Sequence, residues 1–271
     1  MIKQAIIPLA GLGTRMLPLT SVMPKELLPI NGKPNLEYIL DECIEAGIKE
    51  FIFIISKKKK SIKNYFFNDK IYKKLIKKRK DSRLKNEYLK LLRYRKMIKF
   101  VYQNKPQGTG DAVLKCNKFI KDKYFLMLLP DDLIINKNCS KEMISLHKLK
   151  KCSVIASKKI SRKDVSRWGI LSLKNKKKTS FQITNVVEKP KINIAPSNYA
   201  IIGRYILPKT IMNEIKKLKP GQGGEIHITD AIRNLIFKKE KFFGNIFKGK
   251  YLDCGTMSGY IQSGKEIAKL K

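Results

Sequence analysis

The sequence predicts an α/β protein built as a single three-layer α/β/α domain with a mixed, mainly parallel central sheet. Strand-like and helix-like segments alternate in the first half of the chain, which is typical of parallel strands joined by right-handed crossovers. Strand-like segments cluster in the second half, as in a sheet of mixed direction. No linker-like stretch or repeat divides the 271 residues, and 43% of them are hydrophobic. We therefore expect one domain over residues 1–271.

The first β-α-β unit is expected over residues 2–56. Ile2–Leu9 is an apolar run that ends in a glycine turn, which indicates a buried strand. Pro34 suits the first turn of a helix, and Gly47 suits its C-cap. Between them, apolar residues recur at helical spacing: Leu36, Ile39, Leu40, Cys43 and Ile44. Phe51–Ser56 then completes the unit as the second strand.

The following segment, residues 57–98, is predicted to be a long, basic, helical insertion with two amphipathic stretches. Beyond it, the sheet resumes. The further strands expected are Phe100–Gln103, Tyr124–Leu129, Ser153–Ser157, Trp168–Leu173, Phe181–Glu188, Tyr199–Leu207 and Phe242–Phe247. The further helices expected are Gly110–Ile120, Pro208–Leu218, Thr229–Lys239 and Ser258–Leu270.

The charge of the chain raises one functional alternative. The net charge is +37, from 59 basic and 22 acidic residues, and a protein of this kind can bind nucleic acid by neutralising phosphates. We favour a lysine-biased surface, because lysine is spread through nearly every segment and no aromatic RNA-reading motif is present. We therefore expect no specific nucleic-acid partner.

The cysteines and the apolar runs indicate a cytoplasmic protein. The five cysteines are scattered without a C-x-x-C pair, so neither a disulfide framework nor a zinc knuckle is expected. The first residues lack the pattern of a secretory signal. No apolar run reaches the length of about 18 residues that would cross a membrane, so no membrane partner is expected.

The most informative segment is the glycine turn after the first strand, Gly11–Arg15. A turn with little side-chain bulk lets backbone N–H groups approach a phosphate chain, which Arg15 and Lys25 can neutralise. It is not the dinucleotide fingerprint, because Met16 occupies the third glycine position. A P-loop look-alike near the C-terminus is also excluded, since Glu266 stands where Ser or Thr is required. The turn therefore predicts a nucleoside triphosphate site of another kind.

What remains is G-x-G-T-R followed by P-K-E-L-L-P, and this combination resembles the sugar-phosphate nucleotidylyltransferase family. The resemblance runs over essentially the whole chain, because further blocks follow in the order that the family shows. They are Leu129–Asp131, Trp168–Ile170, Val187–Pro190, Ala195–Asn198, Gly224–Ile226, Ile228–Ile232 and Asp253–Gly255. The resemblance implies a Rossmann-like nucleotidyltransferase fold and an enzyme. Glu26 and the insertion are most similar to members that transfer a uridylyl group from UTP to glucose 1-phosphate.

The resemblance places the triphosphate half of the site near the glycine turn. Arg15 would stabilise the β- and γ-phosphates, and Lys25 would reach the phosphates at the reacting centre. Glu26 would orient Lys25 or contact the nucleotide. Gln103 and Gly108 lie where the family reads the pyrimidine, and a glutamine amide can pair with both N3–H and a carbonyl of uracil. The residues expected to offer backbone to the base and phosphates are Ala10, Gly11 and Gly13.

Two aspartates are expected to hold Mg²⁺. Asp131 ends an apolar strand at its carboxyl edge, where open α/β sheets bind their ligands. A carboxylate there suits Mg²⁺, which prefers oxygen ligands, and Asp253 would be the second ligand. Asp132 is interpreted as a surface or capping group, because adjacent residues of an extended chain point in different directions.

The sugar half of the site is assigned to Glu188 and Lys189, with the carboxylate on sugar hydroxyls and the ammonium on the 1-phosphate. Gly169 would let the backbone approach the sugar. Thr109 and Asp111 depart from the residues that the members named above carry. Transfer to another sugar 1-phosphate, or from dTTP, therefore remains an alternative, and a basic nucleic-acid-binding protein is the alternative of another class. The resemblance also implies a homodimer or homotetramer.

Overall fold

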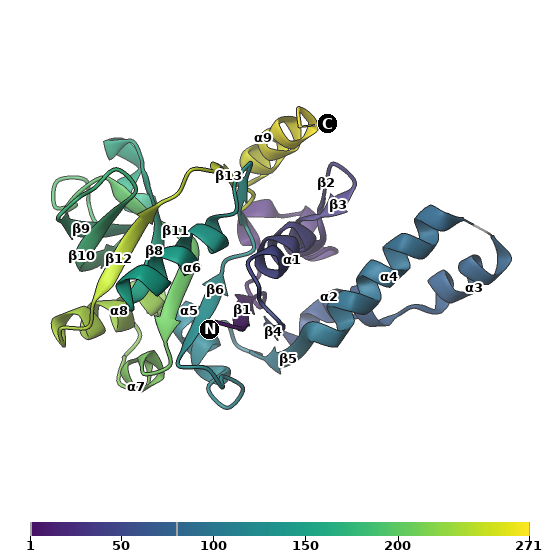
Figure 1. The fold of residues 1–271 in the computed structure, drawn as a ribbon, viewed down its shortest axis with the longest axis horizontal. Helices are drawn as coiled ribbons and strands as arrows, with labels where there is room; N and C mark the ends of the chain where they lie inside the picture. The colour runs from purple at the N-terminus through teal and green to yellow at the C-terminus, as the bar shows by residue number, and fades with distance from the viewer. Residues whose placement is uncertain (1, 80, 271) are drawn as a thin grey trace.

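The computed structural model describes residues 2–79 and 81–270, and a mixed β-sheet runs through its centre (Figure 1). Its strands, in chain order, are β1 (Gln4–Pro8), β4 (Glu50–Ile55), β5 (Ile98–Tyr102), β6 (Tyr124–Leu128), β8 (Ser153–Lys159), β9 (Gly169–Lys174), β10 (Ser180–Glu188), β11 (Tyr199–Pro208) and β12 (Phe242–Ile246). Within the described residues these nine strands lie side by side in the order β5-β4-β1-β6-β11-β8-β12-β10-β9. Each strand that the sequence predicts is confirmed, with ends shifted by at most two residues.

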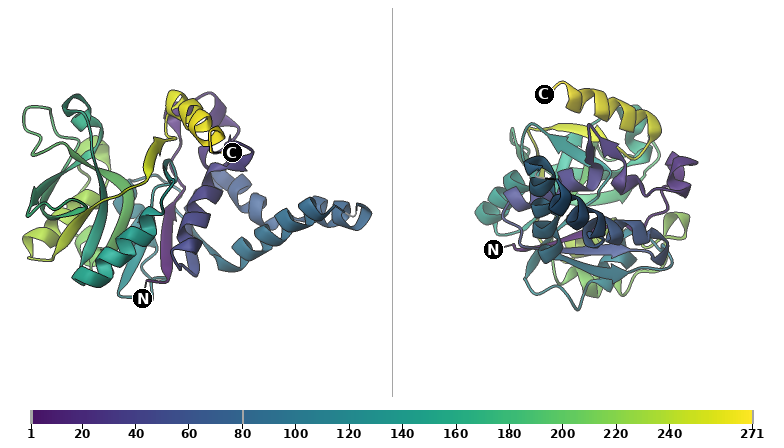
Figure 2. Two further views of the ribbon diagram at one scale, coloured as in Figure 1. Left: turned by 45° about the horizontal axis from the view of Figure 1, so that its top comes forward. Right: turned by 90° about the vertical axis from the view of Figure 1, so that its right-hand side faces the viewer.

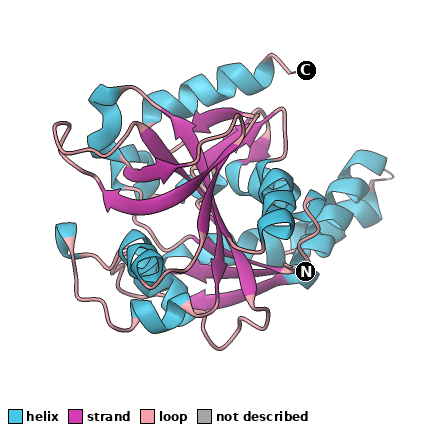
Figure 3. Ribbon diagram, turned by 60° about the vertical axis from the view of Figure 1, so that its left-hand side comes forward, coloured by secondary structure: helices cyan, strands magenta, loops and turns pink. Residues whose placement is uncertain are grey.

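Helices cover both faces of the sheet, which confirms the predicted three-layer arrangement (Figure 3). Alternate side chains of β1 explain this, because Ala5 and Ile7 lie in the core of one face and Ile6 lies in the core of the other. The helices are α1 (Asn35–Glu45) and α6 (Cys139–Lys150) on the first face, and α5 (Thr109–Lys115), α7 (Ile211–Ile215) and α8 (Ile228–Phe237) on the second. None of the helices in the described residues is long and apolar enough to cross a membrane.

Parallel pairing is concentrated in the N-terminal half of the sheet. β1 is parallel to its neighbours β4 and β6, and β5 is parallel to β4. β11 is antiparallel to both β6 and β8. Along the strand order, four neighbouring pairs of described strands are parallel and four are antiparallel. Because β1 and β6 run in the same direction, the loops that follow them meet at one edge of the sheet.

The segment in which the sequence predicts a helical insertion, residues 57–98, is mainly helical and projects from the sheet as an arm (Figure 2). Its helices are α2 (Lys60–Phe67), α3 (Lys70–Lys78) and α4 (Ser82–Met97). Phe66 anchors the base of the arm in the main core, and farther out the ring of Tyr72 stacks on that of Tyr88. Ile71, which belongs to the first predicted amphipathic stretch, is 70% exposed. The arm therefore buries only part of its apolar surface.

Several elements lie outside the sequence prediction. α6 was not predicted, because its apolar residues form no clear stripe; the available signal is Asn138, whose side chain caps the helix by accepting from Lys141 N at 2.9 Å. The strands β7 (Asp132–Ile135) and β13 (Lys250–Asp253) form an antiparallel ribbon that sets Asp253 opposite Asp132. A second ribbon joins β2 (Pro29–Ile30) and β3 (Lys33–Pro34). By contrast, the predicted helix Ser258–Leu270 is present as α9 (Met257–Ala268).

A buried arginine holds the loop that follows β6. Arg204 lies on β11, is 0% exposed, and forms an ion pair with Glu42 of α1 at 2.9 Å. Its Nη1 also donates to the carbonyl oxygens of Leu129 at 3.2 Å and Gly203 at 3.1 Å. Asn35 Nδ2 donates to the carbonyl of Pro130 at 2.9 Å. The backbone just before Asp131 is therefore fixed by groups from α1 and β11.

Replacement of Arg204 by Met should destabilise the protein, because it leaves the carboxylate of Glu42 buried without its cation. We expect the free energy of unfolding to fall by about 3–5 kcal/mol, measured by urea denaturation. R83M, at an exposed position of α4, is the matched control and should change it by less than about 0.5 kcal/mol. An R204M protein within about 1 kcal/mol of the wild type would contradict this role.

The cysteines should be unreactive in the folded protein. All five are buried free thiols, and burial raises the pKa of Cys152 to about 11 and those of Cys116 and Cys254 to about 12. Because the thiolate is the reactive form, we expect Ellman's reagent to label no cysteine in the native protein and all of them after denaturation. Rapid native labelling of a single thiol would show that its burial is wrong.

Candidate active site

A cavity of about 370 Å³ lies at the edge of the sheet where the loops after β1 and β6 meet. Every residue predicted for the nucleotide and for catalysis lines it. These residues are Ala10, Gly11, Gly13, Arg15, Lys25, Glu26, Gln103, Gly108 and Asp131. They come from four separate segments of the chain, which the tertiary structure brings together at one cavity.

The glycine turn is shaped by its lack of side chains. Gly13 has a φ of +70°, and a Cβ atom there would lie 3.1 Å from Cγ2 of Thr20. The carbonyl of Gly13 accepts a hydrogen bond from Thr20 Oγ1 at 2.8 Å, which fixes the turn. At Gly11 an added Cβ would meet no atom within 4 Å. The turn therefore leaves its backbone accessible from the cavity.

An ion pair between Lys25 and Asp131 forms the centre of the cavity wall. Lys25 Nζ lies 2.5 Å from Asp131 Oδ2, and Arg15 Nη2 approaches the same oxygen at 3.4 Å. Burial lowers the pKa of Lys25, but Asp131 and Glu26 outweigh it, so the pKa is raised overall. Burial raises the pKa of Asp131, but Lys25 and Arg15 outweigh it, so that pKa is lowered. Both side chains are therefore charged near neutral pH.

Glu26 forms a second ion pair directly beside Lys25. It is 1% exposed, and both of its oxygens lie 2.8 Å from Lys59 Nζ. Burial, more than offsetting the attraction of Glu26, lowers the pKa of Lys59. Glu26 thus holds the segment of Lys25 against the start of the helical insertion. Lys59 was missed from the sequence, because nothing distinguishes it from the lysines on either side.

Asp131 and Asp253 face the same small space, which is kept open by Gly255. A Cβ atom on Gly255 would lie 2.8 Å from Asp131 Oδ2 and 3.1 Å from Asp253 Oδ1. Gly255 N donates to Asp253 Oδ1 at 2.8 Å. No cluster of three or more potential metal-ligating side chains occurs in the described part of the chain. Two carboxylates fit Mg²⁺, which commonly takes its remaining ligands from water and substrate phosphates.

The interpretation of Asp132 as a surface or capping group is wrong. Asp132 is buried, and its Oδ2 accepts from Gly203 N at 3.0 Å while its Oδ1 accepts from the hydroxyl of Tyr251 at 2.7 Å. Burial, together with the neighbouring charge of Asp131, raises the pKa of Asp132 to about 6. The side chain turns inward because β7 and β13 pair there, an arrangement that local sequence does not reveal. Asp132 therefore ties the Asp131 loop to β11 and β13.

The predicted sugar residues form a separate group that does not line the cavity. Gly169 and Glu188 are cross-strand partners on β9 and β10. Glu188 Oε2 accepts from Thr229 Oγ1 at 3.0 Å, and Glu188 Oε1 lies 3.9 Å from Lys189 Nζ. Lys189 has a φ of +42°, so its backbone is left-handed.

One arginine connects this group to the aspartate pair. Arg167 precedes β9 by two residues, and its Nη2 lies 3.7 Å from Asp253 Oδ2. The neighbouring Trp168 packs edge-on against the ring of Tyr251, which belongs to the same ribbon as Asp253. The sugar group is thereby joined to the edge of the nucleotide cavity. Sequence reasoning missed Arg167, although it directly precedes one of the family blocks.

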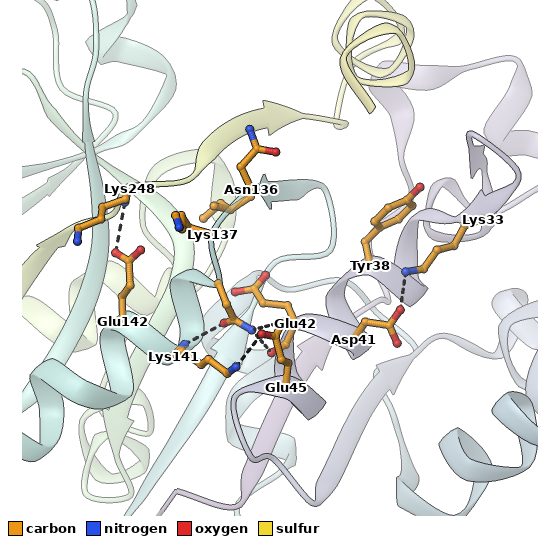
Figure 4. A pocket seen from close by; sticks show the side chains of 12 residues that line it. Lys33, Tyr38, Asp41, Glu42, Glu45, Asn136, Lys137, Lys141, Glu142 and Lys248 are labelled. Carbon is orange, nitrogen blue, oxygen red and sulfur yellow. Dashed lines mark hydrogen bonds and ion pairs between the residues drawn. The ribbon is translucent and has the colours of Figure 1, made fainter. Parts of the chain in front are cut away.

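A larger cavity of about 700 Å³ lies between α1 and α6, and none of the predicted site residues lines it (Figure 4). Most of its charged side chains are already paired. Lys33 lies 2.5 Å from Asp41, Lys141 lies 2.6 Å from Glu45, and Glu42 is bound by Arg204. Size alone therefore does not identify the site, whereas the convergence of predicted residues does.

Comparisons with known proteins agree with this geometry. A family model described as nucleotidyl transferase matches residues 4–269. A putative UTP–glucose-1-phosphate uridylyltransferase of Methanocaldococcus jannaschii is 39% identical over 98% of this chain and 93% of its own length. The UTP–glucose-1-phosphate uridylyltransferase of Bacillus subtilis is 36% identical over 98% of this chain and 91% of its own.

Two solved structures are also similar along nearly the whole chain. An apo UDP-glucose pyrophosphorylase matches with a TM-score of 0.89 and 34% identity over 99% of both chains. A UTP-bound UGPase from Acinetobacter baumannii matches with a TM-score of 0.89 and 32% identity over 98% of this chain and 93% of its own. The resemblance read from the motifs is confirmed, and the chain belongs to the nucleotidyl transferase family.

Proposed function

We propose that this protein transfers the uridylyl group of UTP to glucose 1-phosphate and releases UDP-glucose and pyrophosphate. The single observation that carries the proposal is the convergence of the glycine turn, Arg15, Lys25, Gln103 and Asp131 on one cavity. The names of the full-length relatives support UTP and glucose 1-phosphate as the substrates.

The reaction needs positioning and charge more than acid–base chemistry. A phosphate oxygen of the sugar 1-phosphate attacks the α-phosphorus in line, and pyrophosphate leaves from the opposite side. Because this nucleophile is already an anion, no strong general base is required. Cations that hold both anionic reactants and stabilise the charge on the transferring group supply most of the catalysis. In this proposal Arg15 binds the β- and γ-phosphates and Lys25 binds the phosphates at the reacting centre.

We further propose Mg²⁺ as the metal, held by Asp131 and Asp253. When bound, such an ion supplies charge stabilisation to phosphate oxygens. The two carboxylates on either side of Gly255 fit this role. Lys25 and Arg15 contact Asp131 Oδ2, so they also fix the orientation of that carboxylate. The ion pair between Glu26 and Lys59 holds the segment that carries Lys25 in place.

The sugar half of the proposal uses Gly169, Glu188 and Lys189. The carboxylate of Glu188 accepts hydrogen bonds from sugar hydroxyls, and its bond from Thr229 Oγ1 holds it in place. Lys189 neutralises the 1-phosphate, and Gly169 leaves room for the sugar beside Glu188. The ion pair between Arg167 and Asp253 lies between the two halves. We also propose that the protein acts in the cytoplasm as a homodimer or homotetramer, which light scattering after size-exclusion chromatography would test.

The function is tested by pyrophosphate release from a panel of UTP, dTTP and CTP with glucose, galactose and N-acetylglucosamine 1-phosphates. We expect turnover to be fastest with UTP and glucose 1-phosphate, and to stop when the divalent metal is chelated. D131N should lower kcat at least about 100-fold, as loss of one key electrostatic group does. D81N, which alters an exposed helix cap in the arm, is the control and should keep wild-type turnover. Absence of pyrophosphate release with every pair would refute the proposed function.

Replacement of Lys189 by Met should weaken binding of the sugar phosphate selectively. We expect KM for glucose 1-phosphate to rise about 10- to 100-fold, because one charge-assisted contact to phosphate is lost, while KM for UTP stays within about twofold. K174M removes an exposed lysine at the end of β9 and should change neither value. An equal rise of both KM values for K189M would place Lys189 outside the sugar half.

A further inference from the structure

Gln103 occupies a fixed position in the wall of the nucleotide cavity. It follows β5, its backbone N–H donates to the carbonyl of Ile55 at 2.9 Å, and its side chain lines the cavity although the residue is only 3% exposed. The NH₂ group of a buried glutamine amide needs hydrogen-bond acceptors, whereas its carbonyl oxygen needs a donor. The direction in which this amide points therefore decides what it offers to a ligand.

The amino group of Gln103 is directed away from any ligand by two acceptors. Gln103 Nε2 donates to Asp111 Oδ2 at 2.6 Å and to the carbonyl oxygen of Gly108 at 3.3 Å. An amide nitrogen carries two hydrogens, so both are used within the protein. This differs from the expectation that Gln103 would offer a donor as well as an acceptor to uracil. Only the amide carbonyl is left for the cavity.

Asp111 cannot hold the amide the other way round. Its Oδ1 forms an ion pair with Lys115 Nζ at 3.1 Å, so the side chain is a carboxylate, which accepts hydrogen bonds and donates none. The second acceptor is equally fixed, because Gly108 has a φ of +99° and an added Cβ would lie 2.5 Å from the carbonyl oxygen of Ile226. If the amide were flipped, the carbonyl oxygen of Gln103 would face Asp111 Oδ2 and the carbonyl oxygen of Gly108, with no hydrogen between them.

The carbonyl oxygen of Gln103 is available on the cavity side. Within residues 2–79 and 81–270, Oε1 receives no hydrogen bond, and it is absent from the fully buried side-chain atoms that lack a partner. It is therefore in contact with the space of the cavity. A base in that space meets an acceptor, and it must supply a donor to avoid leaving this oxygen unsatisfied.

We propose that Asp111 is a positioning residue that sets the base preference of the site by making Gln103 an acceptor only. The inference rests on the proposed function, in which the cavity holds a nucleoside triphosphate. An acceptor-only Gln103 favours a pyrimidine that carries a ring N–H, as uracil and thymine do at N3. It disfavours cytosine, whose N3 is itself an acceptor and would face the oxygen without a hydrogen between them.

The test compares UTP with CTP, because the two differ at the donor and acceptor positions of the base and little in size. Wild-type protein should prefer UTP at least about tenfold in kcat/KM, the effect expected of one buried hydrogen bond. D111N is isosteric, but the amide of Asn both donates and accepts hydrogen bonds. The amide of Gln103 can then also adopt the flipped orientation, with its NH₂ group toward the cavity. We expect the ratio of UTP to CTP to fall at least about tenfold, mainly through KM, with a smaller change in kcat.

Three further variants separate a positioning role of Asp111 from other effects on the UTP-to-CTP ratio. K115M removes the ion pair but keeps the carboxylate of Asp111 on Gln103, so the ratio should stay within about twofold of the wild type. D111E keeps an acceptor-only side chain and should restore most of the preference that D111N loses. Asp111→Ser, whose hydroxyl also both donates and accepts, replaces D111N if thermal unfolding shows that D111N does not fold.

The outcomes distinguish this inference from the proposed function. Wild-type turnover with UTP, together with an unchanged ratio in D111N, would overturn the role of Asp111 and leave the function standing. If the wild type releases no pyrophosphate, the function is refuted, and calorimetric binding of UTP and CTP to the same variants decides the inference. Equal loss of both nucleotides in D111N and D111E would show a structural role only.

Discussion

The position of the candidate site depends on one buried charge. Arg204 stands in a strand that is otherwise apolar and buried along its whole length. A charge there is tolerated only if it is paired and its donors are satisfied. Glu42 and the carbonyl oxygens of Leu129 and Gly203 meet that requirement, and in doing so they fix the backbone that leads to Asp131. The position of the Asp131 carboxylate therefore depends on contacts made in the core.

Around this fixed loop, buried charged side chains form ion pairs. Lys25 is held by Asp131, and Lys59 is held by Glu26. Because each cation has a carboxylate within hydrogen-bond distance, Lys25 in the cavity wall and Lys59 next to it are held in place before an anion arrives. Arg15 contributes a third cation with a mostly exposed side chain, so it is the group best able to follow a moving phosphate. Preorganised charge of this kind suits a reaction between two anions.

The base-reading wall follows the same logic with uncharged groups. Asp111 and Gly108 accept the two hydrogens of the Gln103 amide within the protein. Recognition of the base is therefore left to the carbonyl oxygen of Gln103. A site that presents an acceptor alone can reject a base by leaving that acceptor unpaired, which discriminates more strongly than a difference in size.

Local sequence determined the α/β class, the helical arm and most strands, because periodicity and turn chemistry act over a few residues. The residues that gather at the cavity were indicated mainly by the resemblance of the motifs to the family. It could not determine which polar groups meet. Arg204 and Glu42 are 162 residues apart, Lys59 and Glu26 are 33 apart, and Asp132 turns inward only because β13 returns beside it. Such contacts arise when strands and helices pack. The tertiary structure alone therefore decided how Asp131 is held, that Lys59 supports the site, and which face of Gln103 remains free.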